Sequence, residues 1–404
     1  MGSLYMEFLQ LYVQSLSKHK QLLEKLKQEC IRIRNYTIEK LFDLWNEAKD
    51  NLENLGIEVV LVKDKDEFWK IFPKYIEGVG KIAKTKTNVG KELELTKKLR
   101  NLGYTVCETD CGDFIVEVLG EESSHPMIPA LHLDTEKIAS GLKERLGINV
   151  APTPEAIKEA VRQHVKRFLQ DCEVGITGAN FVSADGSIFL QENEGNISLV
   201  SRLKKHIVVT SLEKIVPDRQ AALRLCELQA LACSAQPLGS YLSVISGPSQ
   251  TGDIGGRLLR GMYGAEEVVV IVVDNGRSKL LDSQYREVLR CISCGACVAV
   301  CPLCAAGKVQ GLELKGLRGV LFQRYQHRLE ELAPCIFSCS LCGACEQVCP
   351  MNIPWTKFIR LLRQECAAAG LLPEQLKQMA EKMKRYMNPI GEAKPGKDLQ
   401  FFCC

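Results

Sequence analysis

The sequence has no long hydrophobic run. Its longest apolar run, Val268 to Val273, is far too short to span a bilayer, and the N-terminus lacks the charged, apolar and small-residue regions of a signal peptide. We therefore expect a chain that does not span a membrane and that lies in the cytoplasm. The net charge of +3 is close to balance, so the composition gives no reason to expect nucleic acid as a partner.

Complete nucleotide-binding motifs are also missing. The stretch from Gly247 to Gly252 has the spacing of a phosphate loop, but Asp253 stands where such a loop needs lysine, and a carboxylate there would repel phosphate. No complete dinucleotide fingerprint appears either. The sequence therefore shows no acceptor for a hydride.

Cysteine, in contrast, is abundant, with 19 residues. In a cytoplasmic chain this number indicates metal ligation rather than disulfides. Eight cysteines form two copies of Cys-x2-Cys-x2-Cys-x3-Cys-Pro, the spacing of a ferredoxin with two [4Fe-4S] clusters, in which the fourth cysteine of each copy binds the other cluster. We expect a first cluster on Cys291, Cys294, Cys297 and Cys349, and a second on Cys339, Cys342, Cys345 and Cys301.

Structural zinc and a disulfide framework are the alternative interpretations of this pattern. Zinc takes four ligands, commonly as two Cys-x2-Cys pairs, and would leave the third cysteine of each loop unexplained. Disulfide frameworks belong to small secreted chains. The duplicated pattern therefore favours two clusters and a chain that carries electrons. The long spacer between the copies, with helical character from Leu317 to Leu332, predicts a helical ferredoxin module.

Hydrophobic periodicity divides the chain into four parts. We predict a helical N-terminal extension (1–53), an α/β domain with a mainly parallel sheet (54–280), the ferredoxin module (281–370) and a polar tail (371–404). Thr153 and Pro154 mark the start of one helix as its N-cap and first residue. Helices are also expected over residues 4–53, 66–77, 91–102, 278–290 and 354–366, and strands over residues 57–62, 104–107, 114–119, 174–176, 187–190, 207–210, 241–245 and 268–273.

Polar turns follow several of the predicted strands. Ligands bind outside the carboxyl ends of the strands in open parallel sheets, so short polar side chains at these turns are candidates for a binding site. The alternative is that the glycines and asparagines serve tight turns. The candidate ligand-binding residues are Asn180, Glu192 and Asn196, and the candidate catalytic residues are His132, Glu194 and Asp253. His132 follows an apolar run, and a histidine in that position is more often structural than catalytic.

Taken together, several sequence blocks resemble the lactate utilization protein B family between about residues 81 and 363. The blocks are Gly175-Ile-Thr-Gly-Ala-Asn180, Glu194-Gly-Asn196, Ser211-Leu-Glu-Lys-Ile-Val-Pro217, Asp274-Asn-Gly-Arg277 and the two cysteine motifs. The resemblance implies a LUD domain, with a fold similar to the sugar-isomerase and CoA-transferase class, fused to a helical ferredoxin. It also implies a role in oxidising L-lactate to pyruvate beside a cysteine-rich CCG-domain subunit and a smaller LUD-only subunit.

Some residues depart from that family pattern. Cys304 and Cys335 are additional cysteines near the motifs, and the tail ends in Cys403 and Cys404. Two hypotheses remain: an iron–sulfur subunit of a complex that oxidises L-lactate or another 2-hydroxy acid, or an electron-transfer and docking subunit of another CCG-domain or flavin-dependent complex, whose LUD domain only binds partners. Either case needs a two-electron acceptor, such as a flavin on a partner subunit.

Overall fold

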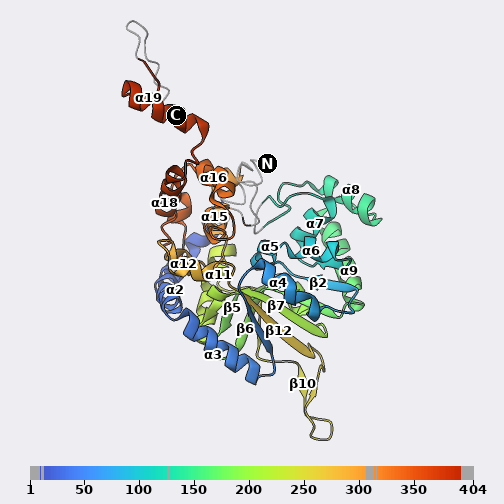
Figure 1. Ribbon diagram of the computed structural model, residues 1–404. Helices are drawn as coiled ribbons and strands as arrows, with labels where there is room; N and C mark the ends of the chain where they lie inside the picture. Colours follow the sequence, from blue (N-terminus) through green and yellow to red (C-terminus); the bar gives the residue numbers. More distant parts are fainter. Residues whose placement is uncertain (1–9, 11–12, 125–127, 306–313, 315, 393–404) are drawn as a thin grey trace.

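A six-stranded parallel sheet forms the centre of the computed structural model, which describes residues 10, 13–124, 128–305, 314 and 316–392 (Figure 1). The strand order is β1-β12-β7-β4-β2-β3, and every neighbouring pair is parallel. Because both faces of a parallel sheet are covered, its inner strands are largely buried, and β12 contains the buried apolar run Val268 to Val273. In chain order the strands are β1 (Glu58–Val62), β2 (Lys81–Lys84), β3 (Thr105–Glu108), β4 (Val174–Thr177), β7 (Lys205–Ser211) and β12 (Glu267–Val273).

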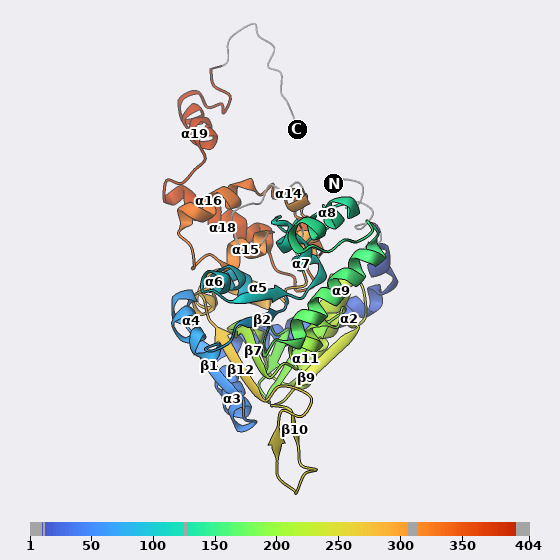
Figure 2. The ribbon, with the colours of Figure 1, turned by 90° about the vertical axis from the view of Figure 1, so that its right-hand side faces the viewer.

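A smaller, mixed sheet lies beside the first, with the order β8-β5-β6-β9. Strand β5 pairs parallel with β8 and antiparallel with β6, and β6 pairs antiparallel with β9. A two-stranded hairpin, β10–β11, projects from the body of the domain (Figures 1 and 2). These strands are β5 (Phe181–Ser183), β6 (Ser187–Glu192), β8 (Ile215–Val216), β9 (Tyr241–Ile245), β10 (Gln250–Thr251) and β11 (Leu259–Arg260). The mainly parallel α/β domain predicted from the sequence is therefore confirmed.

Helices cover the large sheet in separate groups. One buried cluster joins Phe68, Phe72 and Leu99 to strand residues such as Ile207 and Ile271, and another joins α7, α8 and α9 to β3. The helices and 3-10 turns of this domain are α4 (Lys65–Ile71), η1 (Phe72–Tyr75), α5 (Asn88–Glu92), α6 (Leu95–Asn101), α7 (Cys111–Leu119), α8 (Thr135–Leu146), α9 (Pro154–Gln170), α10 (Asn196–Val200), η2 (Leu212–Lys214) and α11 (Arg219–Ser234).

The N-terminal extension is built into the core. In its described part, helix α2 (Lys20–Glu39) contacts α11, and helix α3 (Leu41–Asn54) contacts β1 and β8. Leu26, Cys30 and Ile38 of α2 belong to one buried cluster with residues of the C-terminal module. The extension therefore contributes to the contact between the two domains.

The C-terminal module is helical, as predicted, and its segments lie above the sheet domain in Figure 1. The last helix, α19, has no buried residue and projects away from the body. The elements of this region are α12 (Arg277–Leu281), η3 (Arg286–Arg290), α13 (Ala296–Ala299), α14 (Pro302–Ala305), α15 (Gly316–Phe322), α16 (Leu329–Ser338), α17 (Ala344–Gln347), α18 (Trp355–Ala368) and α19 (Glu374–Tyr386). The predicted domain boundaries themselves stay predictions.

Several predicted elements were wrong or too long. Residues 114–119 form part of helix α7 and not a strand, because Asp110 caps a helix by accepting from the Asp113 backbone N–H at 3.0 Å and the apolar face packs against α8 and α9. The helix predicted over 91–102 is divided at Glu94, whose φ of 50° is left-handed. The helices predicted over 278–290 and 317–332 are each divided into two shorter elements. In contrast, the predicted cap is confirmed, since Thr153 Oγ1 accepts from the Ala156 N–H at 3.4 Å.

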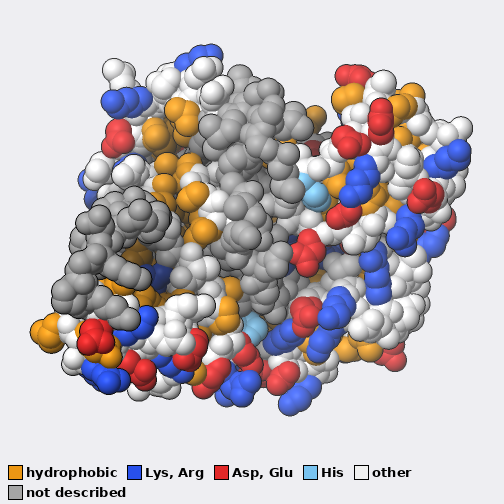
Figure 3. Space-filling model, turned by 90° about the horizontal axis from the view of Figure 1, so that it is seen from above, with side chains coloured by type: hydrophobic (Ala, Val, Ile, Leu, Met, Phe, Trp, Pro, Cys, Tyr) orange, Lys and Arg blue, Asp and Glu red, His pale blue; other side chains and the backbone are white. Residues whose placement is uncertain are grey.

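The surface carries both signs of charge. Lys and Arg side chains lie among Asp and Glu side chains on the face seen from above (Figure 3), in keeping with the near balance of charge in the sequence. Of the helices in the described part of the chain, none combines the length and apolar character that a membrane-spanning segment needs.

Candidate iron–sulfur centres and interdomain cavity

The first cysteine loop wraps round a small cavity. Cys291, Cys294, Cys297 and Cys349 all line it, so the fourth cysteine of the second copy lies with the first three of the first copy. Ser293 and Gly295 have left-handed φ values of 62° and 80°, which turn the loop sharply. This turn brings the Ser293 N–H to 3.4 Å from Cys291 Sγ, where it donates a hydrogen bond to the sulfur.

The second cysteine loop repeats this conformation. Leu341 and Gly343 have φ values of 57° and 79°, and the Leu341 N–H donates to Cys339 Sγ at 3.4 Å. A second cavity is lined by Cys301, Cys339, Cys342 and Cys345, together with Cys297 and Cys335. The two copies of the motif therefore have the same backbone conformation. Each cavity is lined by three cysteines of one copy and by the fourth cysteine of the other copy.

Burial makes these thiols hard to ionise without a positive partner. It raises the pKa of Cys294 and Cys297, and raises that of Cys345 to about 12, with neighbouring cysteines adding to each effect. Iron supplies such positive charge, and thiolate is the form that binds it. The described residues include no group of three or more His, Cys, Asp or Glu side chains placed to hold a single metal ion. A [4Fe-4S] cluster is a cube whose four iron atoms each bind one thiolate, so its cysteines lie apart at separate corners. The two four-cysteine cavities fit this arrangement.

The additional cysteines lie beside the second set. The Cys304 side chain is hydrogen-bonded to Cys301 and lowers the pKa of the Cys301 thiol to about 6. Cys335 lines the second cavity. Cys403 and Cys404 lie outside the described residues.

Buried cations surround the first loop. Lys214 Nζ and an Arg318 guanidinium nitrogen both donate to Ser293 Oγ, at 3.1 and 2.9 Å, and Arg34 donates to the Leu289 carbonyl. Burial lowers the pKa of Lys214 to about 8, although Glu213 and Cys291 oppose that effect. In the second loop, Arg363 donates to the Cys339 carbonyl at 2.5 Å. The two loops therefore have different electrostatic surroundings.

Asn180 is a predicted ligand-binding residue that reaches the first loop indirectly. Its Nδ2 donates to Gln229 Oε1 at 2.6 Å, and Gln229 Nε2 donates to the Ile292 carbonyl at 2.5 Å. The Asn180 Oδ1 accepts from the Gln191 N–H at 2.8 Å. This chain of hydrogen bonds connects the α/β domain to the first cysteine loop.

The other candidate carboxylates and amides are engaged within the domain. Glu192 accepts from the Ser198 N–H at 2.7 Å at the start of α10. Glu194 accepts from the Cys111 N–H at 3.1 Å, and burial raises its pKa. Asn196 Nδ2 donates to Thr109 Oγ1 at 3.2 Å. Their roles in ligand binding stay predictions.

Asp253 and His132, the two remaining candidates, lie in separate parts of the domain. Asp253 is in the projecting hairpin, where it accepts from Thr251 Oγ1 at 3.1 Å. His132 Nε2 lies 4.0 Å from Glu121 Oε2, and its Nδ1 is buried without a hydrogen-bond partner in the described part of the chain. The structure therefore does not gather the six predicted residues into one site.

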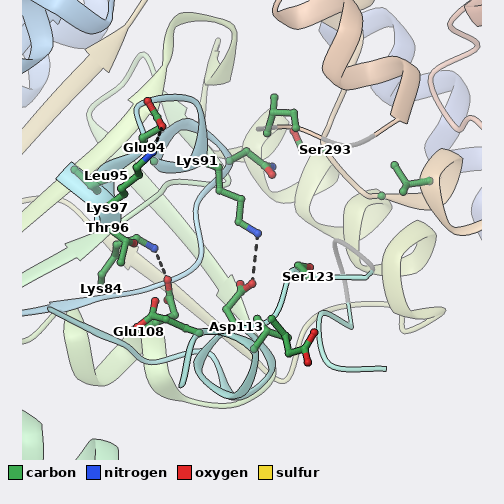
Figure 4. A pocket seen from close by; sticks show the side chains of 18 of the residues that line it. Lys84, Lys91, Glu94, Leu95, Thr96, Lys97, Glu108, Asp113, Ser123 and Ser293 are labelled. Carbon is green, nitrogen blue, oxygen red and sulfur yellow. Dashed lines mark hydrogen bonds and ion pairs between the residues drawn. The ribbon is translucent and has the colours of Figure 1, made fainter. Parts of the chain in front are cut away.

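A larger cavity, of about 440 Å³, lies between the α/β domain and the first cysteine loop. Lys84, Lys91 and Asp113 line it from one side and Ser293 and Arg318 from the other. Figure 4 shows the Lys84–Glu108 and Lys91–Asp113 pairs at this cavity. None of the six residues predicted from the sequence lines it.

Sequence reasoning missed the Lys84–Glu108 pair. These residues end the neighbouring parallel strands β2 and β3 and are partners in register. Both are nearly fully buried, at 3% and 4% exposed, and burial raises the pKa of Glu108 to about 7 although Lys84 opposes it. The available signal was Glu108, which directly follows the strand predicted over 104–107. The strand β2, which ends at Lys84, was not predicted from the sequence.

The fold and the two cysteine loops define the class as an iron–sulfur protein, in which an α/β domain is fused to a helical dicluster module. The model of the LUD domain family matches residues 45–273, and that of the 4Fe-4S dicluster domain family matches residues 287–353. The chain belongs to the LUD domain family and carries a 4Fe-4S dicluster domain, the two domains that its resemblance to the lactate utilization protein B family implied.

Curated relatives share these features over part of their length. The chain is 35% identical over 280 residues to "Lactate utilization protein B" of Bacillus cytotoxicus and 36% identical over 279 residues to the protein of that name from Bacillus cereus AH820. Each match covers 67% of this chain and 56% of the relative, so the chain spans about half the length of these relatives. A solved structure of a DUF162 family protein from Deinococcus radiodurans is also similar, with a TM-score of 0.32, 13% identity and coverage of 58% of this chain and 98% of that one.

Proposed function

We propose that the chain is the iron–sulfur electron-transfer subunit of a complex that oxidises L-lactate or a related 2-hydroxy acid. The observation that carries this proposal is the grouping of the eight motif cysteines around two cavities, each completed by a cysteine of the other copy. The similarity to proteins named for lactate utilization supports the substrate class. Two [4Fe-4S] clusters would be held by Cys291, Cys294, Cys297 and Cys349, and by Cys339, Cys342, Cys345 and Cys301.

The electron balance requires partners. Conversion of a 2-hydroxy acid to a 2-oxo acid releases two electrons and two protons, and each cluster carries one electron at a time. We infer that a flavin on a partner subunit accepts the electron pair and that the clusters carry the electrons onward singly. A CCG-domain subunit, a smaller LUD-only subunit or a flavoprotein is the kind of partner that this scheme requires.

The cluster assignment is tested by metal analysis and electron paramagnetic resonance of the anaerobically isolated chain. About eight irons and eight acid-labile sulfides per chain are expected, with two signals after reduction. Cys349→Ser should perturb the signal of the first cluster and Cys301→Ser that of the second. Cys172→Ser is the matched control, because Cys172 is buried outside both loops and its thiol donates to backbone carbonyls, as a hydroxyl can. Zinc instead of iron would refute the assignment.

A second candidate function is a docking role, in which the LUD domain holds partners and takes no part in substrate chemistry. The chain Asn180–Gln229–Ile292 favours this alternative, because it uses a predicted ligand-binding residue to hold the two domains together. Anaerobic addition of L-lactate separates the two functions. Bleaching of the cluster absorbance by the isolated chain supports a catalytic LUD domain, whereas bleaching only with a partner supports docking.

A further inference from the structure

The interdomain cavity has the size of a ligand site and reaches the first cysteine loop. Its volume of about 440 Å³ lies within the range of about 300–1,000 Å³ that is typical of small-molecule pockets. Ser293 and Gly295 of the loop form part of its wall, opposite Lys84 and Lys91 of the α/β domain. A molecule bound here would therefore lie against the peptide that wraps the first cluster.

The carboxylates of the cavity wall already have cationic partners. Glu108 pairs with Lys84, and Asp113 Oδ1 lies 3.4 Å from Lys91 Nζ. Glu117 pairs with Arg100, and Glu121 with Lys137. The lysines on this wall are thus largely neutralised by neighbouring acids.

Arg318 differs from these lysines in its hydrogen-bond partners. It is 7% exposed and donates to Ser293 Oγ at 2.9 Å, and its side chain stacks on Phe322 at 5.0 Å. Its Nε is buried without a hydrogen-bond partner, and no carboxylate pairs with Arg318 among the described residues. Arg318 also lines the cavity of the first cluster, so the thiolates of that cluster are its negative neighbours. Its Nε is still left without an acceptor, and the planar fork of donors of a guanidinium matches a carboxylate.

An acceptor lies on the opposite wall. Glu108 Oε1 is buried and has no hydrogen-bond partner in the described part of the chain, although Oε2 pairs with Lys84. A ligand hydroxyl could donate to Oε1. The cavity therefore offers one site for a carboxylate and another for a hydroxyl, which are the two groups of a 2-hydroxy acid.

We propose that this cavity binds a small 2-hydroxy carboxylate, with the carboxylate on Arg318 and the hydroxyl on Glu108, and that binding lowers the reduction potential of the first cluster. The proposal rests on the function proposed above, because it needs the first cluster to be assembled. Arg318 and Cys297 line the same cavity, that of the first cluster, so the guanidinium charge favours the Cys297 thiolate. An anion on Arg318 offsets that positive charge, so the cluster accepts an electron less readily. By reciprocity, reduction of the cluster weakens anion binding by the same factor.

The test is an anaerobic redox titration of the loaded full-length chain, followed by electron paramagnetic resonance. The probe is 2-hydroxy-2-methylpropanoate, which has no hydrogen on its second carbon and so cannot be oxidised to a 2-oxo acid. We expect the saturating probe to make reduction of the first cluster about tenfold less favourable, a shift of about 59 mV for one electron, and to leave the second cluster unchanged. Glycerol should have no effect, and 2-methylpropanoate, which lacks the hydroxyl, should bind more weakly.

Variants of Arg318 connect the shift to this cavity. Arg318→Gln should abolish probe binding and the shift, and Arg318→Lys should retain a reduced shift because lysine keeps the charge but loses the fork. Arg328→Gln is the matched control, since it removes the same charge from the same module at a side chain that is 78% exposed. If Arg318→Gln fails to assemble the first cluster, the wild-type titration and Arg318→Lys still decide the matter.

Failure of this proposal is distinct from failure of the proposed function. Iron content and the two signals establish whether the clusters are present, independently of any ligand. With both clusters present, no probe-dependent shift, an equal shift of both clusters, or an undiminished shift in Arg318→Gln would each overturn the cavity assignment. Loss of iron from the wild-type chain would instead overturn the proposed function.

Discussion

Replacement of Arg277 by methionine should destabilise the protein strongly, because Arg277 neutralises two buried carboxylates. Its guanidinium bonds Glu92 through two nitrogens, at 2.6 and 2.7 Å, and its Nε lies 3.2 Å from Glu213. The three side chains are 1%, 0% and 2% exposed. Asn275 and Gln326 also donate to Glu92, at 3.0 and 3.1 Å. The cluster therefore connects the α/β domain, the segment after β12 and the ferredoxin module.

The magnitude follows from what the substitution leaves behind. Removal of one partner of a buried ion pair typically costs about 3–5 kcal/mol, since the remaining charge stays buried without compensation. The double variant Arg277→Met/Glu92→Met should regain part of this loss, because an apolar pair can replace a buried ion pair at little cost. Urea unfolding followed by tryptophan fluorescence, with the clusters loaded under anaerobic conditions, measures both changes.

The loss should also depend on pH. Burial alone would raise the pKa of Glu213, but Arg277 and then Lys214 outweigh burial and hold it at about 2. In the wild type this pair therefore contributes stability above the ordinary glutamate pKa, and the contribution falls as the pH drops toward 2. Without Arg277, burial is opposed mainly by Lys214 and raises the pKa of Glu213 in the folded state, so protonation of Glu213 relieves the loss. The difference between variant and wild type should be smaller at pH 5 than at pH 7.

Arg162→Met provides the matched control. Arg162 bonds Glu159 on the surface of α9, where the side chains are 54% and 40% exposed, and its loss should leave the unfolding midpoint unchanged. A loss below about 1 kcal/mol for Arg277→Met, or one as small as that of the control, would refute the argument that the buried carboxylates depend on Arg277.

Three further predictions concern individual residues. Lys214→Met should lower the reduction potential of the first cluster by roughly 90 mV, because a unit charge at about 8 Å and an effective dielectric constant of about 20 contributes about 2 kcal/mol. An anaerobic redox titration measures this shift. An unchanged potential would contradict the prediction. Gly175→Ala should destabilise the domain by about 1–3 kcal/mol or more, because an added Cβ would lie 2.1 Å from the Val200 carbonyl oxygen. A thermal midpoint equal to that of the wild type would contradict this, since it would mean that the backbone moves to accommodate the Cβ without cost. Thr153→Ala should cost about 1 kcal/mol in urea unfolding through loss of the cap on α9, whereas Thr153→Asp should retain most of it.

The local elements that the sequence predicted well are those with local causes. The cap at Thr153 depends on residues three positions apart. The left-handed turns at Ser293 and Leu341 were not predicted, although they lie within the cysteine motifs and recur in both copies. The prediction of a strand over 114–119 was wrong, because these apolar residues belong to helix α7 and pack against α8 and α9. A short apolar run is compatible with either a strand or a helix. Helix breaks such as that at Glu94 were likewise missed, because the hydrophobic pattern continues across them.

The sequence by itself determined the inorganic chemistry and the class of fold. The spacing of cysteines within each loop sets which backbone can surround a cluster, and an apolar run such as β12 requires a sheet covered on both faces. Only the tertiary structure decided where the cavity lies and that Arg277 is a buried partner of two acids. Lys84, Glu108 and Arg318 come from three distant segments, so their proximity depends on strand order and on the docking of the ferredoxin module. No local pattern encodes those contacts, because they arise only when the apolar faces of separate elements pack together.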